Sequence, residues 1–283
     1  MRWASACLFL CFCICADHPA NAGAWVYPEG RGQLILTTLL AGARKAYGPD
    51  GRIVATPPYQ KLEARAYVEH GLTDWLTFVG EGSAMRFSGA AAWSYDPLEA
   101  LIAEAKAGLP LWLPPATATR YQGLGLGAAG LRLRLLDEGA YVVSAEASVR
   151  TASQAARRFL DMRQPPQADA RLLMGRKFEL FGLAGFLDTQ LGFRSGGQNG
   201  NEFRLDLTAG LRPFERLLIM GQSFSAIAPR GARTGAITEQ KFQLSAVFEA
   251  TPSISVQIGR VAALGGVNAP AEQGIISAIW WRY

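Results

Sequence analysis

The sequence predicts an all-β fold, a single up-and-down antiparallel transmembrane β-barrel of about twelve strands. Three observations predict it. The chain opens with a segment that has the pattern of a secretory signal, apolar and polar residues alternate through most of the remaining chain, and short and long connections separate the alternating segments in turn. Together they describe a chain that leaves the cytoplasm and turns one face of each strand toward lipid.

The composition excludes several other classes of protein. The chain has 283 residues, of which 49% are hydrophobic and 18% charged, with a net charge of +5. Such a chain has ample apolar surface to bury, so it is not disordered. Its four cysteines are Cys7, Cys11, Cys13 and Cys15. The rest of the chain therefore has no thiol for a disulfide framework, a metal cluster or a nucleophile, and no other spacing marks a metal site, so we expect no cofactor.

The first residues predict a cleaved signal peptide over 1–22. Arg2 is the only charge before Asp17, the run Ala6–Ala16 between them is apolar, and Ala20-Asn-Ala22 has the A-x-A pattern of a cleavage site. The alternative is an uncleaved anchor helix, but the apolar run is short for a bilayer span. We therefore predict that residues 23–283 form the outer-membrane β-barrel.

Alternation with a period of two marks the strands. In 201–212, for example, Phe203, Leu205 and Leu207 fall on one face and charged residues on the other. Most such segments have 10–15 residues, and a strand that crosses a bilayer at a tilt needs about 9–11. We predict twelve strands, at 32–46, 59–70, 75–88, 120–136, 140–151, 169–181, 185–195, 201–212, 216–228, 237–250, 254–264 and 272–283.

The connections between these segments alternate in length, which is typical of an outer-membrane barrel. The short ones are 71–74, 137–139, 182–184, 213–215 and 251–253; the longer ones are 47–58, 89–119, 152–168, 196–200, 229–236 and 265–271. An even number of strands places both termini on the short-turn, periplasmic side. A count of ten stays open, because one misread hairpin would remove two strands.

The C-terminal segment resembles the signal by which the barrel-assembly machinery recognises outer-membrane barrels. The chain ends Ile275-Ile-Ser-Ala-Ile-Trp-Trp-Arg-Tyr283, so that Ile279, Trp281 and Tyr283 alternate and the last residue is aromatic. We expect these three residues to form the assembly signal.

A turn motif adds a resemblance to a family. Glu69-His-Gly-Leu-Thr-Asp-Trp-Leu-Thr77 combines a tight turn with an aromatic residue at the start of a new strand. The motif resembles that of outer-membrane transporters of the meta-pathway phenol-degradation type, except that His70 stands where that family has an aromatic residue. The resemblance implies a meander barrel in the outer membrane and a role in transport.

In lipid, the apolar face of each strand must look outward and the polar face inward. About eight strands give an interior filled by side chains and sixteen a wide channel, so twelve predict a narrow aqueous channel or a partly plugged lumen. The charges of the polar face either support the wall as ion pairs or set selectivity. The predicted lumen lining is Lys61, Glu63, Arg65, Arg132, Arg134, Glu146, Arg150, Lys177, Glu179, Asp188, Arg194, Glu202, Arg204, Asp206 and Lys241.

Two segments depart from the plain pattern. The predicted long extracellular loop 89–119 contains a short amphipathic helix over Pro97–Gly108 and an apolar run over Leu109–Pro115. It folds into the mouth and constricts the pore, or it packs on neighbouring loops. Leu217–Phe224 has the least clear alternation, and would line an apolar lumen patch in a barrel that takes up hydrophobic solutes.

The function that these expectations favour is a narrow channel or transporter for small solutes in the cell outer membrane. The alternative is a structural or accessory envelope barrel without throughput, for example in exopolysaccharide export. We do not expect an enzyme, because His70, the one histidine after the signal peptide, falls on the apolar face.

Membrane components are the expected partners besides the assembly machinery and a small solute. Loop arginines and lysines suit lipopolysaccharide phosphates, and the outer face suits outer-membrane lipid. These basic residues are Arg44, Lys45, Arg52, Arg157, Arg158, Arg163, Arg230 and Arg233. We expect no nucleic-acid binding, because no basic stripe is interleaved with aromatic residues.

Overall fold

The computed structural model describes residues 23–90, 118–153, 155–156, 166–197, 200–231 and 235–283. The predicted signal peptide lies outside the described residues, and so does the greater part of the predicted loop 89–119 with its helix. The first described residues, 23–31, precede the first strand.

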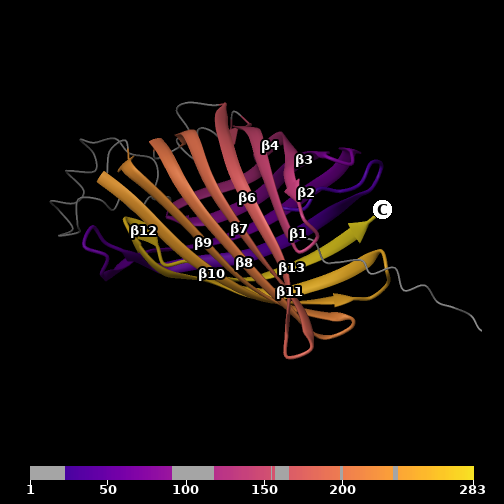
Figure 1. The fold of residues 1–283 in the computed structure, drawn as a ribbon. Coiled ribbons are helices and arrows are strands. Elements are labelled where there is room, and N and C mark those ends of the chain that lie inside the picture. The colour runs from indigo at the N-terminus through magenta and orange to yellow at the C-terminus, as the bar shows by residue number, and fades with distance from the viewer. Residues whose placement is uncertain (1–22, 91–117, 154, 157–165, 198–199, 232–234) are drawn as a thin grey trace, which may run out of the picture.

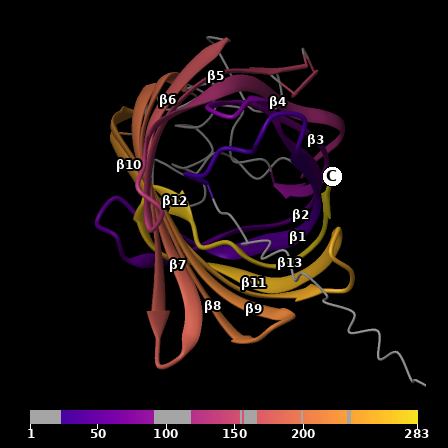
Figure 2. The same cartoon turned by 45° about the vertical axis from the view of Figure 1, so that its right-hand side comes forward.

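Twelve long strands form one closed antiparallel barrel (Figure 1), which confirms the predicted fold class and the higher strand count. Each strand pairs with its neighbours in the chain, and β1 pairs with both β2 and the last strand, so the ring has no open edge (Figure 2). The long strands are β1 (Gly32–Tyr47), β2 (Ile53–Thr73), β3 (Leu76–Ala90), β4 (Ala118–Asp137), β5 (Tyr141–Ala152), β6 (Gln167–Leu180), β7 (Leu183–Gly197), β8 (Gly200–Phe214), β9 (Leu217–Gly231), β10 (Gly235–Glu249), β11 (Ile254–Val267) and β13 (Gln273–Arg282). A two-residue strand, β12 (Ala269–Pro270), pairs with β1.

The predicted start of the second strand at residue 59 is wrong, because β2 begins at Ile53. Pro57 and Pro58 lie in this part of β2, and proline cannot donate to a sheet ladder. The structure accommodates both prolines where the register with β1 shifts, between Ala43 and Lys45. A β-bulge thus carries the strand past residues that the sequence pattern reads as a break.

Large apolar side chains cover the outside of the barrel. Among them are Leu191, Leu205, Ile258 and Ile275, each well exposed on the outer surface. An apolar surface of this extent does not suit water, whereas it matches the hydrocarbon of a bilayer.

The core of the molecule is inside the barrel rather than between two layers. The turns β2–β3, β4–β5, β6–β7, β8–β9 and β10–β11 all lie at one end, which we call the short-turn end. Near it, several inward side chains are apolar: Val142, Leu173, Phe186, Leu218 and Val247 are all buried there. Apolar residues therefore interrupt the predicted polar inward face in this part of the lumen. The physical reason is that the first described residues enter the barrel and cover that part.

Candidate functional site: the barrel lumen

The N-terminal segment (residues 23–29) lies inside the short-turn end and is held by side chains of the wall. The Ala24 amide donates to Asp188 Oδ2 on β7 at 2.7 Å, and Ser144 Oγ on β5 donates to the Ala24 carbonyl at 2.6 Å. Further along, the Tyr27 amide donates to Thr77 Oγ1 on β3 at 3.0 Å. The segment therefore runs across the lumen side of strands from β7 to β3.

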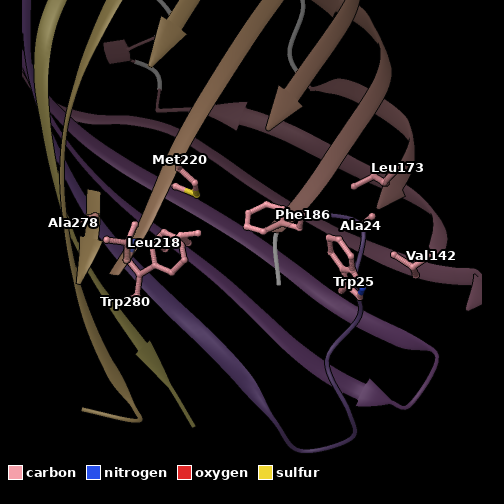
Figure 3. Close-up of a cluster of buried hydrophobic side chains, with 10 residues drawn as sticks. Ala24, Trp25, Val142, Leu173, Phe186, Leu218, Met220, Ala278 and Trp280 are labelled. Carbon is pink, nitrogen blue, oxygen red and sulfur yellow. The ribbon is translucent and has the colours of Figure 1, made fainter. Parts of the chain in front are cut away.

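Apolar side chains complete this obstruction, which we call the floor. Figure 3 shows Trp25 close to Phe186, with a second group around Trp280 on the far strands. The Trp25 and Phe186 rings meet edge to face with centroids 6.2 Å apart. The indole N–H of Trp280 is hydrogen-bonded, because Nε1 donates to Gln257 Oε1 at 3.0 Å. The floor consists of Ala24, Trp25, Val142, Leu173, Phe186, Leu218, Met220, Val247, Ala278 and Trp280.

Arg132 ties the N-terminal segment to the wall. Its side chain is 2% exposed, and it donates to Glu69 Oε1 at 2.6 Å and to Glu146 Oε2 at 2.8 Å. It also donates to the Trp25 carbonyl at 3.2 Å and to the Tyr67 hydroxyl at 3.1 Å. A buried charge with two carboxylate partners and two further acceptors is fully compensated, so this clamp is rigid.

Tyr27 is the ionisable group that the N-terminal segment brings into the lumen. Burial raises the pKa of its phenol, and the nearby charge of Glu69 acts in the same direction. The phenol therefore stays neutral, which suits its place beside the clamp.

Above the floor, the lumen widens into a chamber of about 600 Å³. Ten of the predicted lumen residues line it: Lys61, Glu63, Arg65, Arg132, Glu146, Arg150, Arg194, Arg204, Asp206 and Lys241. Glu202 belongs to the same wall, since it accepts hydrogen bonds from Arg194 and Arg204, each at 2.9 Å.

The other four predicted lumen residues lie toward the short-turn end. Asp188 is buried under the N-terminal segment, and Lys177 Nζ lies 5.8 Å from the centroid of the Trp25 ring. Arg134 pairs with Asp137 at 3.2 Å beside a turn, and Glu179 is exposed near the end of β6. These residues border the floor rather than the chamber.

Sequence reasoning missed several residues of the chamber wall. Asp169 and Arg171 point inward from β6, but the run Leu172-Leu173-Met174 after them hides the alternation. Glu81 was missed because it stands between two glycines of β3, which obscure the alternation of apolar and polar residues. Glu272 was missed because it lies in the connection before β13, where residues do not alternate.

Ion pairs cross the strands on the charged side of the chamber. Arg171 lies 2.9 Å from both Asp169 and Asp206, while Arg194 lies 2.8 Å from Asp169 and 2.9 Å from Glu202. Such cross-strand pairs brace β6, β7 and β8 against one another. Near the opposite end of the lumen, Glu272 accepts from the Tyr59 hydroxyl at 2.9 Å and pairs with Lys61 at 3.3 Å and Lys241 at 3.6 Å.

The two halves of the chamber wall differ in chemistry. The half built by β2 to β8 carries most of the arginines and carboxylates. The half built by β9 to β11, β13 and β1 has fewer charges, namely Lys241 and Glu239 of β10 and Glu272 before β13; its neutral residues include Gln222, Phe224, Gln243, Val261 and Ile276. A solute in the chamber thus meets charges on one side and uncharged groups on the other.

The residues predicted as an assembly signal lie on the outer face of the barrel. Ile279, Trp281 and Tyr283 are all exposed there, and the Trp281 and Tyr283 rings are neighbours with centroids 5.1 Å apart. His70 joins them: its ring stacks on Tyr283 at 5.9 Å, with 3.3 Å between Nδ1 and the Tyr283 hydroxyl. Aromatic residues at this height are typical of the lipid–water interface.

Across the described ranges, no three or more His, Cys, Asp or Glu side chains are grouped so that they could hold a metal ion. The carboxylates of the chamber are engaged mainly with arginines and lysines instead.

Solved structures with this fold are outer-membrane barrels. The COG4313 outer membrane channel from Pseudomonas putida F1 superposes with a TM-score of 0.63 at 14% identity, over 93% of this chain and 99% of that one. The KdgM porin gives 0.50 at 6% identity over 89% and 99%. The translocator domain of the autotransporter NalP from Neisseria meningitidis gives 0.48 at 11% identity over 91% and 90%. At these identities the likeness concerns the fold. No protein-family model and no curated protein sequence matches the chain.

Proposed function

We propose that this chain is an outer-membrane channel for small solutes, with the N-terminal segment as a displaceable obstruction of its lumen. The observation that carries the proposal is the chamber of about 600 Å³ inside a closed barrel whose outer face is apolar. A barrel of twelve strands has room for a narrow passage. The Pseudomonas putida protein that superposes with a TM-score of 0.63 is an outer membrane channel, which supports the proposal.

The way in which the N-terminal segment is held supports a displaceable obstruction. The hydrogen bonds that Ala24, Trp25, Tyr27 and Glu29 make to the barrel go to side chains, not to the sheet ladder. Release of the segment therefore breaks no strand pairing. Within the described residues, the packing of Ala24 and Trp25 and the polar contacts of the segment oppose it.

The test is planar-bilayer conductance of the refolded chain 23–283, compared with a variant that lacks residues 23–29. We expect a small or intermittent current for the intact chain and a current several-fold larger after the deletion, because the floor loses Trp25 and its polar contacts. Ile219→Ala on the outer face is the control and should leave the current unchanged. No current from the deleted chain, when it shows the heat-modifiable migration of a folded barrel, would contradict the proposal.

An accessory barrel without throughput is the second candidate. The observation that favours it is that Arg132 is fully hydrogen-bonded. It has no free N–H donor that a solute could engage to release the segment. In this case the deletion should produce no steady current.

The cell outer membrane is the proposed location, with the short-turn end toward the periplasm. The apolar exterior and the aromatic residues Trp281 and Tyr283 support it. We also propose that Ile279, Trp281 and Tyr283 are read by the barrel-assembly machinery. Arg44, Lys45 and Arg52 are exposed toward the opposite end, where they would meet lipopolysaccharide phosphates.

We propose no catalytic activity. His70 supports this, because it lies on the outer face against Tyr283 and away from the chamber. A hydrophobic-solute variant of the channel draws on Leu218 and Met220, which point into the floor from the segment with the least clear alternation.

A further inference from the structure

Arg150 is the least engaged arginine of the chamber wall. Its one hydrogen bond within the described parts of the chain runs from Nη2 to Glu81 Oε1 at 3.4 Å. That same oxygen lies 3.6 Å from Arg65 Nε, so Arg150 shares a distant partner. Arg194, by contrast, has two carboxylates within 2.9 Å. A guanidinium has five N–H donors, so most of those on Arg150 face the chamber unused.

Two further arginines act on the same place. The charges of Arg194 and Arg204 lie close enough to Arg150 to repel it. Arg204 also has an unused donor, since its buried Nε has no hydrogen-bond partner. The side chain of Arg150 is 17% exposed, so water screens this cluster less than it would screen a surface patch. Arg150 and Arg204 thus have spare donors, and the engaged Arg194 adds its charge, while Glu81 and Asp169 oppose the repulsion among the three guanidinium groups.

The neighbourhood also restricts what can bind. Asp206 Oδ1, which lies 3.9 Å from Arg204 Nη2, is a second buried atom without a hydrogen-bond partner, and it would accept a hydroxyl or an amide but repel a second negative charge. Across the chamber, Phe224, Val261 and Ile276 offer uncharged surface. The site therefore suits a solute with one anionic end and an uncharged body.

We propose that Arg150, with Arg194 and Arg204, forms a binding site for the carboxylate of a small organic monoacid, whose uncharged body faces Phe224, Val261 and Ile276. The inference deepens the proposed channel function, on which it rests for its physiological meaning. A carboxylate is planar and accepts paired N–H donors from a guanidinium, which a spherical halide cannot do. Glu81 competes with the solute for Arg150.

Because Glu81 competes with the solute for Arg150, substitutions of these two residues should change binding in opposite directions. Arg150→Gln should weaken binding of sodium benzoate about tenfold, as expected for the loss of a charge-assisted hydrogen bond. Glu81→Gln should tighten it several-fold, because it frees Arg150 and removes a repelling charge. Arg44→Gln makes the same change of charge as Arg150→Gln at an exposed position outside the chamber, and should leave binding unchanged.

The experiment is isothermal titration of the refolded chain 23–283 in detergent with sodium benzoate, and with benzyl alcohol as the uncharged analogue. Saturable benzoate binding, little binding of benzyl alcohol, and the opposite shifts of the two chamber variants would support the site. Equal binding of both compounds, or the same benzoate affinity in the Arg150 and Glu81 variants, would overturn it. Heat-modifiable migration shows that each variant is folded, and the Glu81 variant tests the site by a gain that misfolding cannot produce.

Titration does not depend on conduction, so the two proposals can fail separately. Benzoate binding, together with no current in potassium chloride from the chain that lacks residues 23–29, would leave the site intact and contradict the channel. Current without benzoate binding would keep the channel and overturn the site. Sodium sulfate, a dianion, should bind more weakly than benzoate because of Asp206, and stronger sulfate binding would also overturn the assignment of a monoacid.

Discussion

The floor and the chamber are built by the same strands, yet they have opposite characters. In the floor, inward side chains such as Leu173 and Leu218 are apolar and buried. In the chamber, the inward positions of the same sheet carry arginines and carboxylates around a hollow space. The difference is the N-terminal segment, which covers the floor and leaves the chamber open. Where a second piece of chain excludes water, an inward position is thus apolar or has its polar atoms paired, as in Asp188 and Ser144.

The largest effect should come from the clamp that joins these two regions. Arg132→Met leaves Glu69 and Glu146 buried without their cation, and should lower the free energy of unfolding by about 3–5 kcal/mol. Arg204→Met, in the more open chamber wall, should cost about 1 kcal/mol or less, because Glu202 keeps Arg194. Guanidinium unfolding in detergent, followed by intrinsic fluorescence, measures both. Equal losses of unfolding free energy in the two variants would contradict the difference between the floor and the chamber.

Neighbouring residues of β9 sharpen the comparison at a smaller scale. Leu218→Ala removes apolar volume from the floor and should cost about 2–4 kcal/mol of unfolding free energy, since no solvent fills the space. Ile219→Ala faces outward, where lipid or detergent refills the gap, and should cost about 1 kcal/mol. The same unfolding assay applies. If the outward variant were the more damaging of the two, the assignment of inward and outward faces would be wrong.

The smallest effect should come from Asp188→Asn. The amide oxygen can still accept from the Ala24 N–H, but the bond loses its charge, which is worth about 1 kcal/mol. We expect faster hydrogen exchange at the Ala24 amide, measured by NMR in micelles, with little change in global stability. The Thr77 contact to Tyr27 is untouched and supplies the internal reference. Unchanged exchange at Ala24 would mean that Asp188 does not hold the segment.

Most of the barrel could be predicted from alternation, because lipid on one side and water on the other impose a period of two. The segment 201–212 illustrates this, since its pattern predicts β8 at nearly its observed length. The start of β2 at Ile53 was missed, and there Pro57 and Pro58 lie in a bulge of β2 opposite Arg44 of β1. That accommodation depends on the partner strand and is not visible locally.

The floor could not be predicted for a related reason. In Leu217-Leu-Ile-Met220 both faces are apolar, so the alternation of apolar and polar residues is unclear. This unclear alternation was the sign in the sequence that the inner face differs here. The inner side chains of that run, Leu218 and Met220, lie in the group around Trp280 of β13, about 60 residues later in the chain, so their partners are not visible locally (Figure 3). The charged side of the chamber was easier to predict, since Arg194, Glu202 and Arg204 alternate regularly with apolar residues in the sequence.

The pairing of β1 with β13 closes the barrel at a seam and does not involve the N-terminal segment that obstructs the lumen. Gln33 pairs with Arg282 across this seam, so the first and last strands complete the ring by backbone pairing. The N-terminal segment hangs from the start of β1 and contributes nothing to that seam. The width of the passage can therefore change while the circumference, set by strand number and register, stays fixed. Loss of the obstruction and loss of the barrel are then two independent events, with separate free energies and separate rates.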